Sequence, residues 1–271
     1  MSLFISSINS GSNGNCYYVG NNQDAVLVDA GISCRETEKR MKRLGLNIQK
    51  VKAIFISHEH SDHIKGVEVL SKKFQLPVFI SERTLRNSGL KIARERIHSF
   101  SHGETIEAGS LRISAFSKWH DAADPFSFTV SHDGTCVGVF TDIGAPCENV
   151  VKHFSKCHAA FLEANYDEQM LTEGRYPAHL KKRIKSDKGH LSNAQALRLF
   201  LDHRSEALSH LLLSHLSKEN NRPELVHSLF LQHAGNTSIT VASRYSESPV
   251  YKVDAEDHSV PVSQAEQLSL F

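Results

Sequence analysis

Short apolar runs recur along this chain of 271 residues, and many of them end abruptly at a polar residue. Runs rich in β-branched and aromatic residues predict strands, at positions 2–9, 16–19, 25–29, 51–56, 78–80, 105–107, 111–116, 126–131, 136–140, 158–162, 208–213, 238–243 and 250–253. Apolar positions at helical spacing predict helices, at positions 35–44, 64–74, 81–88, 192–203 and 223–233. Strands with interleaved helices favour an α/β fold in which two sheets carry helices on their outer faces.

No repeat, low-complexity run or break in composition divides the chain before about residue 253. We therefore expect one domain over residues 1–253, which is long enough to bury a substantial core. Residues 254–271 are polar, contain a proline and lack periodicity, so they predict a flexible C-terminal tail.

The strand predicted at 51–56 leads into the densest group of potential metal ligands, which are His58, His60, Asp62 and His63. On one loop, His58 and His60 can face one cation while Asp62 and His63 face a second. Imidazole and carboxylate without a thiolate favour Zn²⁺, with Mn²⁺ or Fe²⁺ as alternatives. A solvated polar loop is the competing interpretation, but the spacing His-x-His-x-Asp-His after a buried strand has little other use.

Other predicted strands end in a similar way. Leu-Leu-Leu-Ser-His215 repeats the pattern Ile-Phe-Ile-Ser-His58, which makes His215 a further candidate ligand. His210, at the front of the same strand, should lie away from the site. Asp29 also ends an apolar run, where it can accept a hydrogen bond from a metal-bound imidazole or simply form a turn.

Composition adds few constraints. A formal net charge of +1 argues against a wholly basic nucleic-acid binder but permits a local basic patch. Five scattered cysteines are interpreted as buried fillers and suit a reducing cytoplasm. The N-terminus does not resemble a signal peptide, and no apolar stretch approaches the length of a membrane span. We therefore expect a cytoplasmic protein without a membrane partner.

These motifs resemble the metallo-β-lactamase superfamily over nearly the whole chain. The resemblance rests on the hexad from His58 to His63 and on four further motifs: Ser10-Gly-Ser-Asn-Gly-Asn-Cys-Tyr, Asp29-Ala-Gly, Trp119-His-Asp-Ala-Ala-Asp-Pro and Gly189-His-Leu-Ser-Asn. Within the superfamily the chain looks like the YycJ/WalJ-like group, bacterial proteins regarded as DNA exonucleases. The resemblance implies a four-layer αβ/βα sandwich.

The resemblance also implies a centre of two divalent metal ions held by seven side chains: His58, His60 and His120 on the first ion, Asp62, His63 and His215 on the second, and Asp142 bridging both. A shared carboxylate is chemically needed because two close cations require negative charge between them. Asp29 is expected to support the ligands rather than bind strongly. Asp121 and Asp124 are interpreted as supporting or loop-forming residues.

Three further features concern the substrate. His190 resembles a substrate-side histidine of related phosphodiesterases and is the candidate general acid, the alternative being a helix-boundary residue without a role. Asp62 is a second candidate catalytic residue. Asn165 belongs to a polar cluster at a strand end that is expected to touch substrate. A basic run predicts either phosphate contacts or a solvated helix face, and consists of Lys181, Lys182, Arg183, Lys185 and Lys188.

The last five residues, Gln267-Leu268-Ser269-Leu270-Phe271, resemble the bacterial motif that binds the sliding clamp of DNA polymerase. An apolar terminus on a polar tail has nothing local to bury it, so we expect it to act as a short anchored peptide. The alternative is that it docks on its own domain.

Together these features predict a metal-dependent phosphodiesterase. The leading hypothesis is a DNA exonuclease directed at 5′ ends, working in replication-coupled repair such as mismatch repair. The alternative is the same chemistry on RNA or on a small cyclic phosphodiester. Thioester or lactam hydrolysis is less favoured, because a basic run and a proton-donating histidine suit a phosphate better. A clamp-binding adaptor with a vestigial site is also less favoured, because all seven ligands are present.

Overall fold

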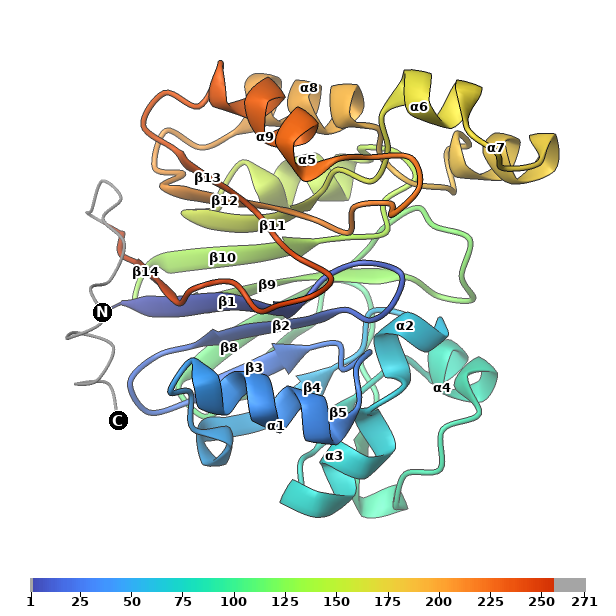
Figure 1. Ribbon diagram of the computed structural model, residues 1–271. Helices are drawn as coiled ribbons and strands as arrows, with labels where there is room; N and C mark the ends of the chain where they lie inside the picture. The colour runs from blue at the N-terminus through green and yellow to red at the C-terminus, as the bar shows by residue number, and fades with distance from the viewer. Residues whose placement is uncertain (1, 256–271) are drawn as a thin grey trace.

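The computed structural model describes residues 2–255, and it confirms the predicted four-layer sandwich of two sheets between outer helices (Figure 1). The first sheet has the strand order β14-β1-β2-β3-β4-β5-β6. Its strands are β1 (Leu3–Asn9), β2 (Cys16–Gly20), β3 (Ala25–Val28), β4 (Val51–Phe55), β5 (Val78–Phe79), β6 (Ile97–His98) and β14 (Tyr251–Val253). The peptide predicted to bind the clamp, residues 267–271, lies outside the described residues.

The second sheet has the order β13-β12-β11-β10-β9-β8-β7. Its strands are β7 (Thr105–Ala108), β8 (Leu111–Ser117), β9 (Phe126–His132), β10 (Thr135–Phe140), β11 (Ala159–Glu163), β12 (His210–Ser214) and β13 (Ser238–Val241). Each sheet has an antiparallel half and a parallel half. The parallel strands are β3 to β6 in the first sheet and β10 to β13 in the second. Parallel strands end at the same edge of a sheet, so the loops that leave them gather there.

Helices cover the outer faces of both sheets (Figure 1). Those beside the first sheet are α1 (Cys34–Arg43), α2 (Ser61–Ile64), α3 (Val67–Phe74) and α4 (Glu82–Ser88). Those on the side of the second sheet are α5 (Glu148–Phe154), α6 (Glu168–Glu173), α7 (Ala178–Ile184), α8 (Asn193–His203) and α9 (Pro223–Leu231). No helix among residues 2–255 is long and apolar enough to cross a membrane.

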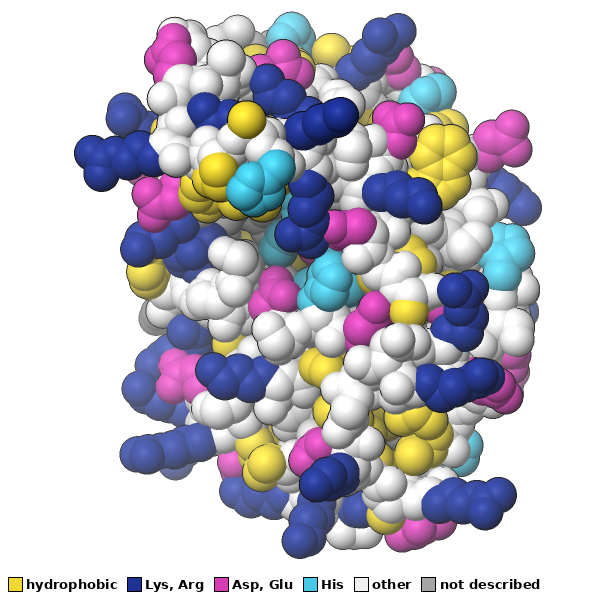
Figure 2. Space-filling model, turned by 90° about the vertical axis from the view of Figure 1, so that its right-hand side faces the viewer, with side chains coloured by type: hydrophobic (Ala, Val, Ile, Leu, Met, Phe, Trp, Pro, Cys, Tyr) yellow, Lys and Arg dark blue, Asp and Glu magenta, His cyan; other side chains and the backbone are white. Residues whose placement is uncertain are grey.

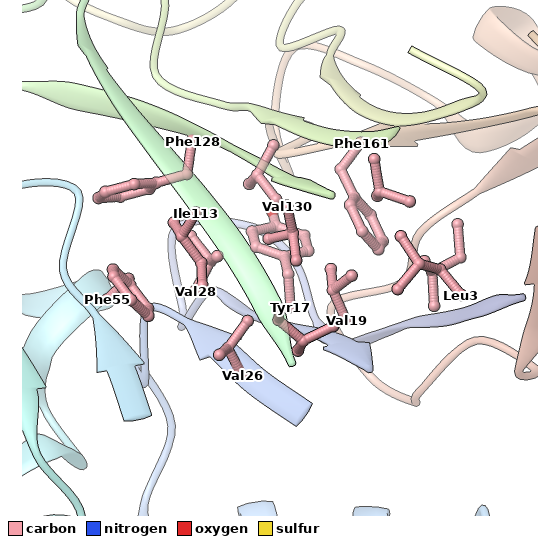
Figure 3. Packing of buried hydrophobic residues seen from close by; sticks show 14 of the residues in the cluster. Leu3, Tyr17, Val19, Val26, Val28, Phe55, Ile113, Phe128, Val130 and Phe161 are labelled. Carbon is pink, nitrogen blue, oxygen red and sulfur yellow. The ribbon is translucent and has the colours of Figure 1, made fainter. Parts of the chain in front are cut away.

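The largest buried cluster lies between the two sheets, with side chains from both (Figure 3). Tyr17 and Phe55 of the first sheet meet Phe161 and Phe128 of the second, with ring centroids 4.9 Å and 5.7 Å apart respectively. Two more clusters fill the space between each sheet and its helices. Burial of these apolar surfaces is the main stabilising contribution to the sandwich, and it fixes both sheets relative to the site at their shared edge.

The structure corrects the helix predicted at 64–74, which is two helices, α2 and α3, interrupted before Val67. Gly66 lies at the break and donates from its amide to the Ala30 carbonyl at 2.7 Å. A Cβ at this position would approach the Ile32 carbonyl oxygen to 2.0 Å, so the close backbone contact requires glycine.

Helices α5 and α6 were not predicted, and α7 was expected only in one of the two interpretations of the basic run. Helix α5 begins after Cys147, which makes no side-chain capping hydrogen bond, and α7 begins after Pro177, which also lacks one. Helices α5 and α7 therefore lack the polar start signal of α4 and α8, where Ser81 and Ser192 cap the helices. Helix α6 does carry such a signal, because the Asp167 side chain accepts from the Met170 amide. Packing, rather than local sequence, decides α5 and α7.

Candidate metal centre and active site

The predicted ligands converge because several strands end at the same edge and turn sharply there. Three of the residues at these turns have left-handed backbone conformations: Asp29 (φ 60°), Asp142 (φ 54°) and His215 (φ 56°). Each follows directly on, or within two residues of, the end of β3, β10 or β12. The turns bring the three side chains to one group of contacts, in which His63 meets Asp29 and Asp142, and Asp142 meets His215. Figure 2 shows this face with histidines and carboxylates at its middle.

The first group of candidate ligands is formed by His58, His60 and His120, whose ligand atoms lie within 4.8 Å of one another. His58 Nε2 lies 3.0 Å from His60 Nδ1. His120 donates from Nδ1 to the Gly189 carbonyl at 3.0 Å, which leaves its buried Nε2 facing the group. A carboxylate oxygen of Asp121 lies 3.3 Å from that nitrogen, consistent with a supporting position.

The second group is formed by Asp62, His63 and His215. Asp62 Oδ2 lies 3.6 Å from His63 Nε2 and 3.5 Å from His215 Nε2. Asp142 lies between the two groups, with Oδ2 3.2 Å from His63 Nε2 and Oδ1 3.8 Å from His120 Nε2. The structure thus brings together all seven predicted ligands and places the Asp142 carboxylate between the two groups.

Several buried polar atoms in this centre have no hydrogen-bond partner within the described chain. They include His120 Nε2, His215 Nε2 and Asp142 Oδ2. A buried polar atom without a partner is costly, so a cluster of them at functional residues needs an explanation. Imidazole nitrogens and carboxylate oxygens are the donors that a divalent transition-metal ion prefers. The residues present therefore fit a metal centre.

Asp29 occupies the supporting position that the resemblance implied. Its carboxylate accepts from the Ser57 amide and hydroxyl, both at 2.8 Å, and contacts His63 Nδ1 at 2.7 Å. With Nδ1 engaged, Nε2 of His63 is the nitrogen directed at Asp142 and Asp62. Such a contact fixes both the tautomer and the orientation of the ring.

Glu163, the last residue of β11, is a functional residue that the sequence analysis did not single out. It is completely buried, and its Oε1 lies 2.8 Å from His190 Nδ1 and 2.9 Å from His215 Nδ1. Its Oε2 accepts from the Ile143 amide at 2.7 Å, directly after Asp142. One carboxylate therefore contacts a candidate ligand, the candidate acid and the backbone that follows the candidate bridge. The available signal was its place at a strand end, which it shares with Asp29.

Asn165 and Asn15 hold the loops that carry the ligands. Asn165 donates to the backbone carbonyl of His215 at 2.7 Å, so it fixes a ligand in addition to lining the pocket described below. Asn15 donates to Asp62 Oδ2 at 3.2 Å, and its own amide donates to the Asp62 carbonyl at 2.7 Å. Gly31 packs against the same carbonyl, where an added Cβ would lie 1.7 Å from the oxygen.

The electrostatic field of the centre separates its histidines into two kinds. Burial lowers the pKa of His58 well below its ordinary value and that of His120 to about 3, so both are neutral and present a free lone pair. Burial opposes protonation of His63 and His215 too. Asp142 and other carboxylates outweigh it, so the pKa of His63 is raised well above normal and that of His215 to about 10. Metal binding would release protons from these two rings.

A pocket of about 180 Å³ opens beside the metal centre and is bordered by His190 and His215. Tyr176, Leu180 and Ile184, from α7 and the residues before it, form an apolar wall. The remaining lining is polar and consists of Ser12, Asp121, Asn165, Arg183, Gly189 and Ser217. Because Glu163 engages Nδ1 of His190, the other ring nitrogen is the one free to act in this pocket.

The basic run divides into two kinds of residue. Lys181 donates to the Thr172 carbonyl at 2.7 Å, Lys185 donates to the Thr172 hydroxyl at 2.8 Å, and Arg183 pairs with Asp121 at the pocket edge. Lys182 and Lys188 are exposed. The prediction that all five contact phosphate stays a prediction, and the structure assigns three of them contacts within the chain.

His210 lies away from the site, as expected. It is buried at the start of β12, where its ring centroid is 5.3 Å from that of Tyr251. None of the candidate metal groups among residues 2–255 includes it.

Comparisons with known proteins agree with this geometry. The family model described as the metallo-beta-lactamase superfamily matches residues 10–134. The chain is 37% identical to the exodeoxyribonuclease YycJ of Bacillus anthracis, with 83% of this chain and 86% of the relative covered. It is 32% identical to the exodeoxyribonuclease WalJ of Streptococcus pneumoniae, with 86% and 88% covered. The crystal structure of the metallo-beta-lactamase fold protein YhfI from Bacillus subtilis superposes with a TM-score of 0.72 at 15% identity, covering 93% of this chain and all of that one.

The chain belongs to the metallo-beta-lactamase superfamily, in the branch that contains the relatives named exodeoxyribonuclease YycJ and WalJ. It is an enzyme of the hydrolase class whose histidine and aspartate groups could bind divalent metal ions. Both the predicted fold and the predicted family are thereby confirmed.

Proposed function

We propose that this protein is a metal-dependent exonuclease that hydrolyses phosphodiester bonds of DNA from a 5′ end. The observation that carries the proposal is the pocket that opens beside the metal centre and presents His190, Arg183 and an apolar wall together. His190 and Arg183 can contact a phosphate, and the apolar wall can contact a nucleobase. The names of the two relatives, which match along more than four fifths of the chain, support the same substrate class.

In this proposal, His58, His60 and His120 would hold one ion, Asp62, His63 and His215 would hold another, and Asp142 would be shared between them. Zn²⁺ suits these ligands best, with Mn²⁺ or Fe²⁺ as alternatives. When bound, the ions supply a nucleophile from water at neutral pH and stabilise the negative charge that develops on the phosphate.

The chain's own residues position the reaction and move its protons. Glu163 fixes the ring of His190 through Nδ1, so that the opposite nitrogen can give a proton to the departing oxygen. Asp62 is partly exposed at the centre and acts in addition as the acceptor for a proton from the attacking water. Asn165, Arg183 and the lysines of the basic run contact the substrate strand.

The shape of the pocket supports action at a strand end. Helix α7 and the residues before it close one side with Tyr176, Leu180 and Ile184. A strand that continued past the site would have to pass through this wall, whereas a terminal nucleotide can fill the pocket. We therefore assign the terminal nucleotide to this pocket.

We further propose that the enzyme acts in the cytoplasm in replication-coupled repair, such as mismatch repair. The support is the resemblance of residues 267–271 to the sliding-clamp-binding motif. A peptide of this kind would bring the enzyme to newly made DNA without taking part in the chemistry.

The test uses the purified full-length protein with Zn²⁺ or Mn²⁺ and with substrates labelled at the 5′ or the 3′ end. Single-stranded DNA, double-stranded DNA and RNA of matched sequence are compared, with Asp142→Ala as the inactive control. We expect stepwise release of nucleotides from the 5′ end of DNA. Faster hydrolysis of the matched RNA would replace DNA by the alternative substrate, and digestion from the 3′ end would overturn the polarity.

A further inference from the structure

A second pocket lies next to the one that holds His190. It has a volume of about 280 Å³, close to the lower end of the range for ligand pockets, which is roughly 300–1,000 Å³. Leu216, Pro223 and Val241 give it an apolar floor, and Lys218, Arg244 and Tyr245 also line it. No part of the proposed reaction uses these six residues.

The two pockets share a wall with each other and with the metal centre. Ser217 lines both of them, while Ser10 lines the second pocket and Ser12 lines the first. The Ser10 hydroxyl accepts the backbone amide of His215 at 2.7 Å. A strand whose end lies in the first pocket and whose phosphate lies at the metals can therefore continue into the second pocket.

Tyr245 presents an aromatic side chain at this pocket that the fold itself does not bury. It is 74% exposed, the largest value among the exposed large apolar side chains of the described residues. Its backbone is nevertheless held at both ends, because its amide donates to the Ser243 hydroxyl at 3.0 Å and its carbonyl accepts from Arg40 at 3.1 Å. An exposed ring on a fixed backbone is suited to stacking against a flat partner.

The charged groups at the pocket favour an anionic partner. Arg244 donates to the Leu216 carbonyl at 2.8 Å, and no carboxylate of residues 2–255 forms an ion pair with it. Lys218 lies 4.0 Å from the Glu219 carboxylate, but both side chains are well exposed, so this pair contributes little and can yield to a phosphate. Sites for single-stranded nucleic acid combine such cations with an aromatic surface for a base.

We propose that this second pocket binds the nucleotide that follows the scissile phosphate, with its base stacked on Tyr245 and its phosphate beside Arg244 and Lys218. The inference rests on the proposed function and adds where the retained strand lies. It makes the second pocket a determinant of affinity for DNA strands rather than a part of the chemistry.

The experiment measures kcat and KM of the full-length, metal-loaded enzyme on a single-stranded DNA trinucleotide and on methyl p-nitrophenyl phosphate, which has only a methyl group in place of the retained strand. Tyr245→Ala should raise KM for the trinucleotide by roughly 5- to 150-fold, the range given by the loss of one base–aromatic stack. The kinetics on methyl p-nitrophenyl phosphate should not change. Tyr245→Phe keeps the ring and should restore the KM of the wild type. Val69→Ala, which also removes an exposed apolar side chain but lies on α3, is the matched control.

An unchanged KM for the trinucleotide in Tyr245→Ala would overturn the inference. So would an equal loss on both substrates, because it would indicate a structural role for the ring. Failure of the proposed function is distinguishable, since the wild type would then hydrolyse methyl p-nitrophenyl phosphate but no DNA.

Discussion

Strained backbone is concentrated at the residues that the chemistry needs. A left-handed conformation at a residue other than glycine costs on the order of 1–3 kcal/mol, and Asp29, Asp142 and His215 all adopt it. Hydrogen bonds hold the turns in place: the Asp29 amide donates to the Phe55 carbonyl at 2.8 Å, and the His215 amide donates to Ser10. The fold thus accepts local strain so that side chains from separate strands point at one centre.

The first prediction concerns Asp142. Metal analysis of the purified protein should approach two ions per chain, and Asp142→Ala should bind fewer because the shared carboxylate is gone. Phosphodiesterase activity should fall with the metal content. Asp202→Ala, which removes an exposed carboxylate on α8, should leave both unchanged. Full activity of the wild type after exhaustive chelation would contradict the metal centre altogether.

The second prediction concerns His190 as the general acid. His190→Ala should retain both ions yet lose roughly 10²- to 10⁴-fold in kcat on DNA, the usual contribution of proton transfer. A nitrophenyl phosphodiester needs no proton on its leaving group and should be hydrolysed at nearly the normal rate. His203→Ala, at the exposed end of α8, is the control. Equal losses on both substrates would assign His190 to positioning the substrate instead.

At the scale of elements, helix α7 presents cations to the entrance of the pocket while its apolar face closes one side. Two of the lysines are already engaged within the chain, because Lys181 and Lys185 donate hydrogen bonds to Thr172 on α6. Lys182 and Lys188 have no such tie in the described chain. These two are therefore the residues best placed to meet a phosphate.

The third prediction follows from this difference. Neutralising the whole basic run should weaken DNA binding uniformly across sequences, and the double variant Lys182→Ala/Lys188→Ala should account for much of that loss. Each lost phosphate contact should reduce the slope of log K against log salt by about 0.7–0.9. The double variant Lys42→Ala/Lys72→Ala, on α1 and α3, is the control. An unchanged affinity and slope would return the run to a solvated face.

The fourth prediction concerns β12, which carries a buried histidine at its start. Burial lowers the pKa of His210 to about 4, and its Nε2 has no hydrogen-bond partner within the described residues. The unfolded chain takes up this proton near pH 6.5, so it binds more protons than the folded chain between pH 6.5 and 4. Burial of the neutral ring therefore has no pH-linked cost above pH 6.5. Below that value the free energy of unfolding decreases as the pH falls.

Urea unfolding of the wild type and of His210→Phe, at pH 7.5 and 5.0, measures this contribution. The wild type should lose roughly 2 kcal/mol more than the variant between the two values. Histidines of the metal centre titrate in both proteins, so their effect cancels in the difference. Equal losses would show that His210 accepts its proton without penalty.

At the scale of the whole molecule, the centre is shared between the two sheets. β3 and β4 deliver Asp29 and the hexad from one side, and β10, β11 and β12 deliver Asp142, Glu163 and His215 from the other. The apolar cluster between the sheets holds these two sets in register (Figure 3). Neither sheet carries a complete set of ligands, so the sandwich is itself a condition for activity.

The fifth prediction concerns the terminal peptide. Deleting residues 267–271 should abolish binding to the sliding clamp in a titration, because Leu268, Leu270 and Phe271 would no longer enter an apolar pocket. Each such side chain contributes about 1.5–3 kcal/mol when buried, less the cost of ordering the peptide, so micromolar affinity is expected. Cleavage of short free DNA should not change. Clamp binding that survives the deletion, or a loss of activity on short DNA, would assign the peptide to the folded domain.

The sequence by itself determined every strand of the described residues except the two-residue β6, and its resemblance to a known family implied the four-layer fold and the seven candidate ligands. Short apolar runs predict buried strands, and a candidate ligand that follows such a run can be identified without knowing its neighbours in space. His58 and His215 are examples, since each stands directly after Ser at the end of an apolar run. Their roles on the metals stay predictions, but the structure brings them to one place.

Only the tertiary structure showed the contacts of Glu163 with the candidate site residues and the two pockets beside them. Glu163 contacts His190 and His215, which are 27 and 52 residues away in the chain. No local sequence pattern predicts these contacts. Helices α5 and α7 lack capping signals that would have placed them. The second pocket combines Ser10 with Arg244, which lie near opposite ends of the described chain. Apolar runs and spacing are properties of the neighbouring sequence, whereas contacts across the sandwich depend on how the two sheets pack.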